Sequence, residues 1–154
     1  MQRQIEELYS PLLGLIQYGA AVNVIERQIL PHGARDEREG EVLRFIRERY
    51  YLPLNAQMTE LIRAKIYLLD AGALPESFQQ FLVHAAQFEC FHSLWKEKGV
   101  SGEHIRPVEY PEEFRRDVEK TLDRLRRRYQ KSVNEVAGGT AKGSPGDGPR
   151  RIQD

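Results

Sequence analysis

Apolar side chains recur along this chain every three or four residues, which is the spacing expected of helices. Four such stripes can be followed, over residues 5–30, 42–69, 78–95 and 114–133. A β-strand would instead alternate apolar and polar positions over a short run, and no segment does so convincingly. The pattern therefore predicts an all-α fold, an antiparallel bundle of four main helices.

Residues that start and stop helices stand at the ends of these stripes. Asp36 and Glu39 form a pair like a capping box before the second stripe. Pro75 and Pro111 open the third and fourth, and each is followed by a glutamate that suits the positive end of a helix dipole. Helix ends are expected near residues 31–33, 70–72 and 99.

Two prolines lie inside the first two stripes. A proline within a helix removes one backbone hydrogen bond and its ring clashes with the preceding turn. The apolar stripe nevertheless continues on both sides of Pro11 and of Pro53. We therefore expect these two helices to be kinked, while true breaks would raise the helix count to five or six. Both prolines follow a tyrosine by two positions and precede a leucine, which suggests one packing purpose.

The chain has 154 residues, the length of one ordinary domain. From residue 137 onward it is rich in Gly, Ser and Pro and nearly free of apolar side chains. Such a segment cannot bury enough surface to offset the entropy lost on ordering. We expect a single helical-bundle domain over residues 1–136 and a disordered tail over residues 137–154.

Composition and charge narrow the classes of partner. Lys plus Arg and Asp plus Glu are equal at 23 each, so no net field points to nucleic acid or to a membrane. The single cysteine, Cys90, excludes an intramolecular disulfide and a cysteine-based zinc site. The most apolar stretch, Leu12–Ile25, is shorter than the roughly 20 residues that a span requires, and no secretory signal opens the chain. A cytoplasmic protein without membrane insertion is expected.

Several short motifs together resemble a group of uncharacterised bacterial all-helical proteins. The resemblance covers residues 5–130 and is carried by Leu8-Tyr9-x-Pro11-Leu12, Leu52-Pro53-Leu54-Asn55, Pro75-x-x-Phe78-x-x-Phe81-Leu82-x-His84, Phe88-Glu89 with Trp95, and Tyr110-Pro111-x-Glu113-Phe114. It implies a helical fold in a bacterial protein and assigns no activity. Members of the group often follow a membrane anchor, and no such anchor is expected here.

The pattern closest to known chemistry is Glu89 with His92, three positions apart on one helix face. Such a pair is half of the ligand set of a carboxylate-bridged di-metal bundle, which needs a second Glu-x-x-His and two more inward carboxylates. The chain has no second Glu-x-x-His. We therefore expect no metal centre and no cofactor, and interpret His92 as a packed histidine with an ordinary hydrogen bond.

Polar residues within the apolar stripes form a second candidate. Asn55 follows the Pro53 kink, and His84 or His92 could pair with it, with Asn23 or with Glu89. Two interpretations stay open: a buried polar network that fixes the bend, or a site for a metal or small ligand. The candidate binding residues are Asn55, His84, Glu89, His92 and Trp95.

No catalytic residue can be singled out, and an enzyme is not expected. Cys90 adjoins Glu89, whose negative charge would raise and not lower a thiol pKa. The serines lack a Gly-x-Ser-x-Gly elbow, and no glycine-rich phosphate loop lies between a strand and a helix.

The leading hypothesis is a non-catalytic domain for protein–protein contacts. Phe91 and Leu94 fall off the main stripe of their helix, which is therefore apolar around much of its circumference. Such a helix is either central in the bundle or shared with a second copy, so Phe91 and Leu94 are candidate homodimer contacts. Residues 112–131 carry 8 basic and 5 acidic groups, which leaves weak nucleic-acid association as a further alternative.

Overall fold

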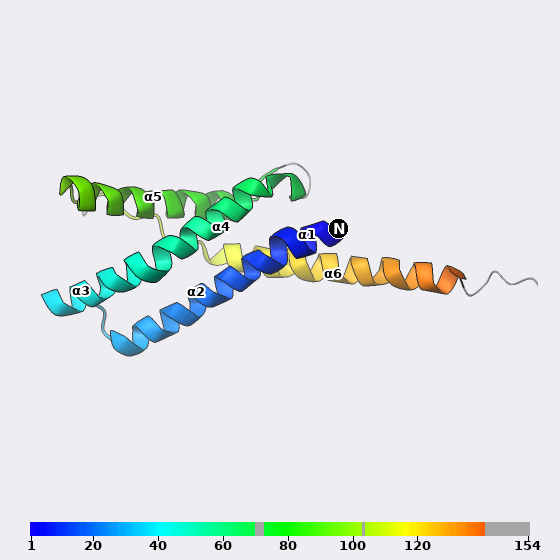
Figure 1. Cartoon of the computed structure of the whole chain (residues 1–154), viewed down its shortest axis with the longest axis horizontal. Coiled ribbons are helices and arrows are strands. Elements are labelled where there is room, and N and C mark those ends of the chain that lie inside the picture. The colour runs from blue at the N-terminus through cyan, green and yellow to red at the C-terminus, as the bar shows by residue number, and fades with distance from the viewer. Residues whose placement is uncertain (70–72, 103, 141–154) are drawn as a thin grey trace, which may run out of the picture.

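The computed structural model describes residues 1–69, 73–102 and 104–140. Within these ranges the chain forms helices and no strands, which confirms the all-α prediction. Four long helical units account for most of the described residues (Figure 1). Their segments are α1 (Gln2–Gln4), η1 (Ile5–Tyr9) and α2 (Ser10–Ile29) in the first unit, α3 (Glu37–Ile46), η2 (Arg47–Tyr51) and α4 (Leu52–Ala64) in the second, then α5 (Glu76–Lys98) and α6 (Glu112–Thr140).

The predicted helix start at Asp36 and the predicted end at Gly99 are confirmed. The Asp36 carboxylate accepts a hydrogen bond of 2.8 Å from the Glu39 backbone N–H. Gly99 adopts a left-handed conformation with φ of 65°, and its N–H donates to the Trp95 carbonyl, which closes α5. The second unit was expected to end at residues 70–72, which lie outside the described residues; α4 ends at Ala64, and a 3-10 turn, η3 (Ile66–Leu68), follows.

Neither proline breaks its helix, because each is preceded by one π-helical turn. In η1 the Ser10 N–H donates to the Ile5 carbonyl, and in η2 the Leu52 N–H donates to the Arg47 carbonyl, both from i to i−5. A π turn forms hydrogen bonds from i to i−5 and so holds one more residue than an α-helical turn. In a regular α-helix the proline would lack its i to i−4 hydrogen bond, because it has no N–H, and its side-chain ring would clash with the preceding turn. The repeated sequence around Pro11 and Pro53 therefore builds the same local structure twice.

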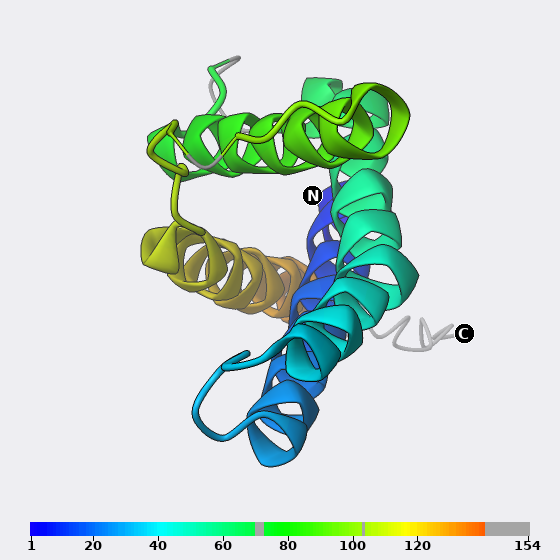
Figure 2. The same ribbon diagram turned by 90° about the vertical axis from the view of Figure 1, so that its left-hand side faces the viewer.

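The helices are arranged as a pair of hairpins. α2 and α4 lie side by side and run in opposite directions, α5 packs on α4, and α6 packs on α2 and α5 (Figures 1 and 2). α5 was expected to be either central in the bundle or shared with a second copy. Val83 on its outer side is 55% exposed, so α5 is not central and covers one side of the bundle, while the shared alternative stays a prediction. The C-terminal part of α6 extends beyond the other helices (Figure 1). It continues to Thr140, past the expected tail boundary at 137, and residues 141–154 lie outside the described residues.

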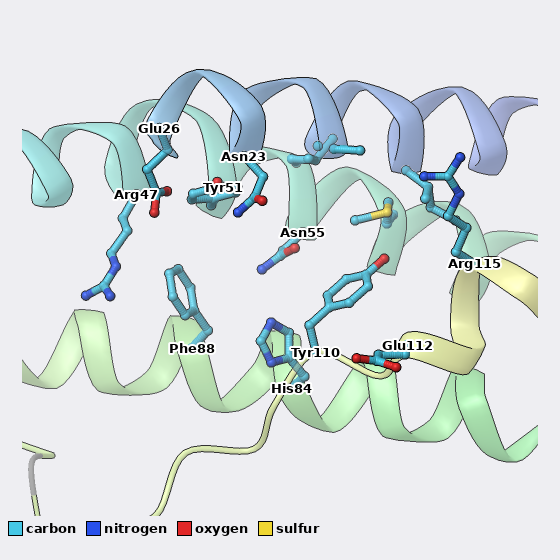
Figure 3. Close-up of a pocket in the computed structure, with 15 residues that line it drawn as sticks. Asn23, Glu26, Arg47, Tyr51, Asn55, His84, Phe88, Tyr110, Glu112 and Arg115 are labelled. Atoms are coloured by element: carbon cyan, nitrogen blue, oxygen red, sulfur yellow. The ribbon is translucent and has the colours of Figure 1, made fainter. Parts of the chain in front are cut away.

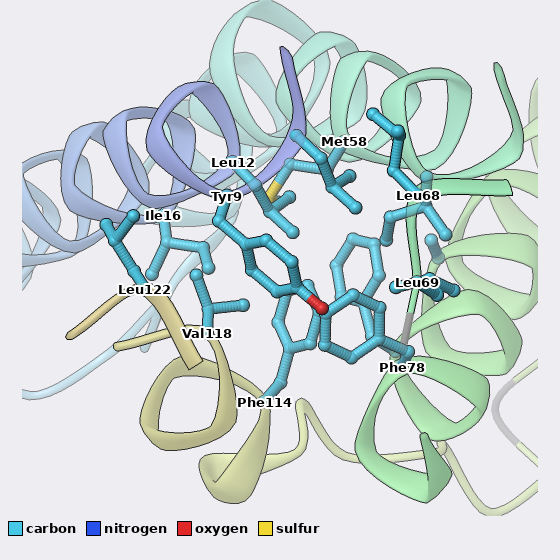
Figure 4. Close-up of a cluster of buried hydrophobic side chains, with 14 of the residues drawn as sticks. Tyr9, Leu12, Ile16, Met58, Leu68, Leu69, Phe78, Phe114, Val118 and Leu122 are labelled. Atoms are coloured by element: carbon cyan, nitrogen blue, oxygen red, sulfur yellow. The ribbon is translucent and has the colours of Figure 1, made fainter. Parts of the chain in front are cut away.

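An aromatic cluster forms the centre of the core where α5, α6 and η1 meet (Figure 4). The rings of Phe81 and Phe114 stack with centroids 4.5 Å apart, and Phe78 meets Phe114 edge-on at 5.0 Å. Apolar side chains from the three helical units other than α5 and from the chain around η3 surround these rings: Leu8, Leu12, Ile16, Leu54, Met58, Ile62, Leu68, Leu69, Val118, Leu122 and Leu125.

Two glycines of α2 form a matched pair for a stability test. A Cβ on Gly14 would have nothing within 4 Å, whereas a Cβ on Gly19 would lie 2.7 Å from Cδ2 of Leu54. Alanine has the higher helix propensity, so Gly14→Ala is expected to raise the free energy of unfolding by about 0.5–1 kcal/mol. Gly19→Ala is expected to gain less, because Leu54 must move. Urea unfolding of both variants checks the order, and a Gly19→Ala variant more stable than Gly14→Ala would contradict the close approach of α2 and α4.

Glu7 connects the first helical unit to the end of α4. Its carboxylate accepts hydrogen bonds from Arg3 at 2.6 Å and from Lys65 at 2.8 Å. The hydrogen bonds from Arg3 and Lys65 lower the pKa of Glu7 from its ordinary 4.5 to about 2. A carboxylate with a depressed folded-state pKa stabilises the fold above its unfolded pKa, and this contribution is lost as pH falls through the folded pKa.

We expect the Glu7 contribution to disappear between pH 4.5 and about 2. Glu7→Gln should therefore lose less stability than the wild type over this pH window. The Glu7 side chain is 31% exposed, so screening by water keeps the difference small. Urea unfolding at several acidic pH values measures it, with Glu6→Gln as the control. If the free energy of unfolding falls equally with pH in the wild type and in Glu7→Gln, the pairs of Glu7 with Arg3 and Lys65 contribute nothing to stability.

The first helical unit also bears on the membrane expectation. Continuity through Pro11 gives a helix of 28 residues, Gln2–Ile29, whose most apolar window has a mean hydropathy of 1.3 and is 28% buried. By length and composition this helix could cross a membrane, although the stretch Leu12–Ile25 by itself predicted otherwise. Core helices and signal sequences have the same properties, so this feature assigns no location.

Candidate functional site

A cavity of about 590 Å³ lies between α2, the η2–α4 segment, α5 and the start of α6 (Figure 3). Its walls are mostly apolar, and a small number of polar side chains reach into it. The lining residues are Ile16, Gly19, Ala20, Asn23 and Glu26 from α2, Arg47, Tyr51, Leu54, Asn55 and Met58 from η2 and α4, His84 and Phe88 from α5, and Tyr110, Glu112 and Arg115.

Asn55 is a mostly buried polar residue whose side chain has no hydrogen-bond partner among the described residues. It is only 9% exposed, and its carboxamide points into the cavity towards His84 (Figure 3). Its side chain makes no hydrogen bond with the part of the chain that the structure describes. The Tyr51 hydroxyl, and not this amide, is the fully enclosed side-chain group without a partner among the described residues, so the Asn55 amide stays accessible from the cavity. A hydrogen-bond partner for the Asn55 carboxamide would therefore have to lie in the cavity.

His84 anchors the segment that closes the cavity. Its Nδ1 lies 2.6 Å from the backbone carbonyl oxygen of Val108. A carbonyl oxygen can only accept, so Nδ1 carries the hydrogen, and in the neutral ring Nε2 is an acceptor. Gln87, one turn along α5, accepts a hydrogen bond from the Val108 N–H. Both backbone polar groups of Val108 are therefore held by α5.

Two tyrosines contribute hydroxyl groups to the same region. Burial raises the pKa of Tyr51 to about 12, with Asn23 and Glu26 close by. The Tyr51 hydroxyl is enclosed and makes no hydrogen bond of good geometry with the described residues. Partial burial against Phe81 and His84 raises the pKa of Tyr110 to about 12. Both phenols therefore stay protonated near neutral pH and can donate hydrogen bonds.

Charged residues of opposite sign stand at the two ends of the cavity. Glu26 and Arg47 lie at one end, and Glu112 and Arg115 at the other (Figure 3). Arg115 pairs with Glu119 at 2.8 Å, whereas Arg47 makes no ion pair within the described ranges. Each end thus carries one acidic and one basic group, so the cavity has no strong preference for a charged ligand.

Three of the predicted binding residues lie outside this cavity. His92 Nε2 is 3.4 Å from the Glu48 carboxylate, and the Trp95 ring stacks against Arg44, whose guanidinium carbon is 4.4 Å from the ring centroid. These contacts join the end of α5 to α3 and η2. His92 and Trp95 line a second hollow of about 620 Å³, of which His84 is also part. Glu89 is exposed and lines a third hollow beside α4.

The arrangement separates the residues of the suggested metal site. Glu89 and His92 line different hollows, and the described ranges contain no group of three or more His, Cys, Asp or Glu side chains that could hold a metal ion. Of the predicted binding residues, Asn55 and His84 meet in the cavity, His84 also lines the second hollow with His92 and Trp95, and Asn55 also lines the third hollow with Glu89.

The two suggested interface residues differ in their surroundings. Phe91 is half-buried, and its ring packs under Gly102, where an added Cβ would come within 3.1 Å of it. Leu94 is 39% exposed and remains accessible to a partner. The homodimer contact thus stays a prediction, with Leu94 the more accessible of the two.

Sequence reasoning missed the contributions of Tyr51 and Tyr110. Both belong to motifs of the sequence, the repeat around Pro53 and the Tyr110-Pro111 pair, but their positions in the chain do not indicate a shared cavity. Comparisons of the chain with protein-family models, with curated proteins and with solved structures found no match, so the resemblance to bacterial helical proteins remains an expectation.

Proposed function

We propose that this chain is a helical binding domain that holds a small organic ligand in the cavity between α2, α4 and α5. The observation that supports this proposal is the unsatisfied carboxamide of Asn55, which is 9% exposed and directed into a cavity of about 590 Å³. Small-molecule sites are typically concave, mostly apolar and about 300–1,000 Å³ in volume, with a few polar groups that orient the ligand.

The alternative role for these residues is a polar network that fixes the bend at Pro53. Such a network would be expected to satisfy its own members, because half-satisfied buried networks are costly. The π turn already accommodates Pro53 without help from side chains. The Asn55 amide has no hydrogen-bond partner among the described residues and stays accessible from the cavity, and the Tyr51 hydroxyl, which lies close to Asn23 and Glu26, makes no hydrogen bond of good geometry there. This pattern favours a ligand-binding site over a structural network whose members satisfy one another.

A matched pair of α2 variants tests the proposal. Ala20 is half-buried and lines the cavity, whereas Ala21 next to it is exposed. Tryptophan at position 20 would occupy part of the cavity, and tryptophan at position 21 would extend into solvent. A set of neutral, flat, fragment-sized compounds is screened by ligand-observed NMR against both variants and the wild type.

We expect some compounds to bind the wild type and Ala21→Trp but not Ala20→Trp. Circular dichroism shows whether both variants remain helical. If no compound binds the wild type, or if Ala20→Trp binds as well as Ala21→Trp, the proposal is wrong.

A second candidate is the protein–protein interaction domain, favoured by the protruding part of α6. The apolar stripe of Leu122 and Leu125 continues into Tyr129, Val133 and Val136, which are 37%, 43% and 71% exposed. The Tyr129 hydroxyl still reaches Gln2 at 3.5 Å, and the helix then extends past the rest of the molecule (Figure 1). A helix with an uncovered apolar stripe is only marginally stable in water, so a partner helix would stabilise it.

Light scattering over a range of concentrations tests self-association through this segment. If the partner is a second copy, Val136→Glu should shift the mass towards the monomer, whereas Asn134→Glu, on a different face of α6, should not. A monomeric wild type would limit this candidate to other partners.

Weak nucleic-acid association through Arg126, Arg127 and Arg128 would instead predict binding that falls steeply with salt.

A further inference from the structure

We propose that the ligand of the cavity is a flat heterocycle with a hydrogen-bond donor and an acceptor side by side, as in a lactam or a nucleobase, and that Asn55 reads this edge. This inference rests on the proposed binding function and adds the chemical class of the ligand.

The chemistry of a carboxamide supports the donor–acceptor edge. The Asn55 side chain presents one acceptor oxygen and two N–H donors in a single plane, and none of them has a partner among the described residues. A ligand with one donor and one acceptor in adjacent positions satisfies both sides of the amide at once, as asparagine does with adenine in nucleic acids. A carboxylate would leave the amide oxygen unsatisfied, and an ammonium group would leave the amide N–H groups unsatisfied.

The aromatic walls support a flat ligand. The rings of His84 and Phe88 lie 6.2 Å apart with planes 25° from parallel, and the Tyr110 ring meets His84 edge-on at 5.6 Å. These three rings stand on the side of the cavity opposite Asn55 (Figure 3). Aromatic surfaces favour ligands with a π system, since stacked and edge-to-face contacts add to the burial of apolar area. A planar ring between them and Asn55 would present its edge to the carboxamide.

The charges around the cavity favour a neutral ligand. The lining holds two acidic and two basic side chains: Glu26 and Arg47 at one end, and Glu112 and Arg115 at the other, where Arg115 also pairs with Glu119. The ordinary tyrosine pKa of 10 already keeps the hydroxyls of Tyr51 and Tyr110 neutral near neutral pH, and burial raises the pKa of each further, to about 12. Binding must therefore come from ring contacts and from the hydrogen bonds of Asn55, with His84 Nε2 as one further acceptor.

A pair of probes that differ by one donor tests this assignment. 2-Pyridone carries the N–H donor beside its carbonyl acceptor, and N-methyl-2-pyridone keeps the ring and the acceptor but lacks the donor. Adenine and 9-methyladenine extend the test to a nucleobase that keeps a donor–acceptor edge after methylation. Affinities are measured by NMR titration against the wild type, Asn55→Leu and Ala20→Trp.

We expect 2-pyridone to bind the wild type about tenfold more tightly than N-methyl-2-pyridone, the effect of one good hydrogen bond to a buried amide. Asn55→Leu should remove this preference, and Ala20→Trp should remove binding of both probes. If the two probes bind the wild type equally, or if Asn55→Leu keeps the preference, the assignment to Asn55 is overturned while the binding function stands. If the wild type binds none of the probes and none of the fragment set, both proposals are overturned.

The stability of the ligand-free protein provides a readout that needs no probe. Leucine is close to asparagine in size and removes the unsatisfied amide, so Asn55→Leu should raise the unfolding midpoint by about 3 °C. Gln57→Leu, at an exposed position of the same helix, serves as the control and should change it less. A lower midpoint for Asn55→Leu would show that the carboxamide stabilises the fold itself, and would overturn the assignment.

Discussion

Phe114→Ala is expected to lower the free energy of unfolding by about 3–5 kcal/mol, the largest effect of any single substitution considered for this protein. Phe114 is fully buried, with 0% of its side chain exposed. Its ring stacks on Phe81 at 4.5 Å and meets Phe78 at 5.0 Å and Tyr110 at 6.2 Å. Alanine would remove these contacts and leave a cavity where α5 meets α6, because three neighbouring rings cannot all move into the space.

Urea unfolding followed by circular dichroism measures this loss. Phe45→Ala is the matched control, since the Phe45 side chain is 60% exposed and the chemical change is the same. The control should lose much less stability than Phe114→Ala. Similar losses for the two variants would mean that the aromatic cluster between α5 and α6 is not the centre of the core.

The second large effect is expected from His84→Ala combined with Gln87→Ala, which releases the segment before α6. The His84 ring donates to the Val108 carbonyl at 2.6 Å, and Gln87 accepts from the Val108 N–H. Each hydrogen bond contributes about 0.5–1.5 kcal/mol net, so the double variant should lose about 1–3 kcal/mol. The local effect should be larger, because residues 104–110 have no helix of their own to hold them.

Hydrogen exchange of the Val108 amide is the direct measurement for this variant. It should become much faster in the double variant, while Gln80→Ala on the exposed side of α5 leaves it unchanged. Because Tyr110 is part of the cavity wall, weaker probe binding should accompany the faster exchange. Unchanged exchange at Val108 would show that other contacts hold this segment.

The candidate site was only partly predictable from the sequence. Asn55 and His84 were selected because they are polar residues within apolar helical stripes, and both line the cavity. Glu89 and His92 were selected by their spacing on one helix, but His92 faces Glu48 on a neighbouring segment, whereas Glu89 is exposed. Spacing along a helix sets which residues share a face, but not which neighbour that face meets.

At the two prolines, too, the sequence pattern did not predict the backbone structure in full. The repeated surroundings of Pro11 and Pro53 correctly indicated one shared structure, but the expected alternatives were a kink and a break. The structure continues both helices without a break and inserts a π turn before each proline, which neither alternative specified. The hydrogen-bond pattern of a single turn depends on the local backbone and its packing, which the spacing of apolar residues does not report.

The sequence by itself determined the helical class, the four helical units and several of their ends, because periodicity and capping depend on residues within one or two turns of each other. Which polar residues meet depends on the packing of the helices and does not follow from the sequence pattern. The cavity joins residues of α2, α4, α5 and the segment at Tyr110, which are as far apart as Ile16 and Arg115 in the chain. Their meeting depends on how whole helices cross and how closely they approach, as at Gly19 against Leu54, and these distances result from the packing of the entire core.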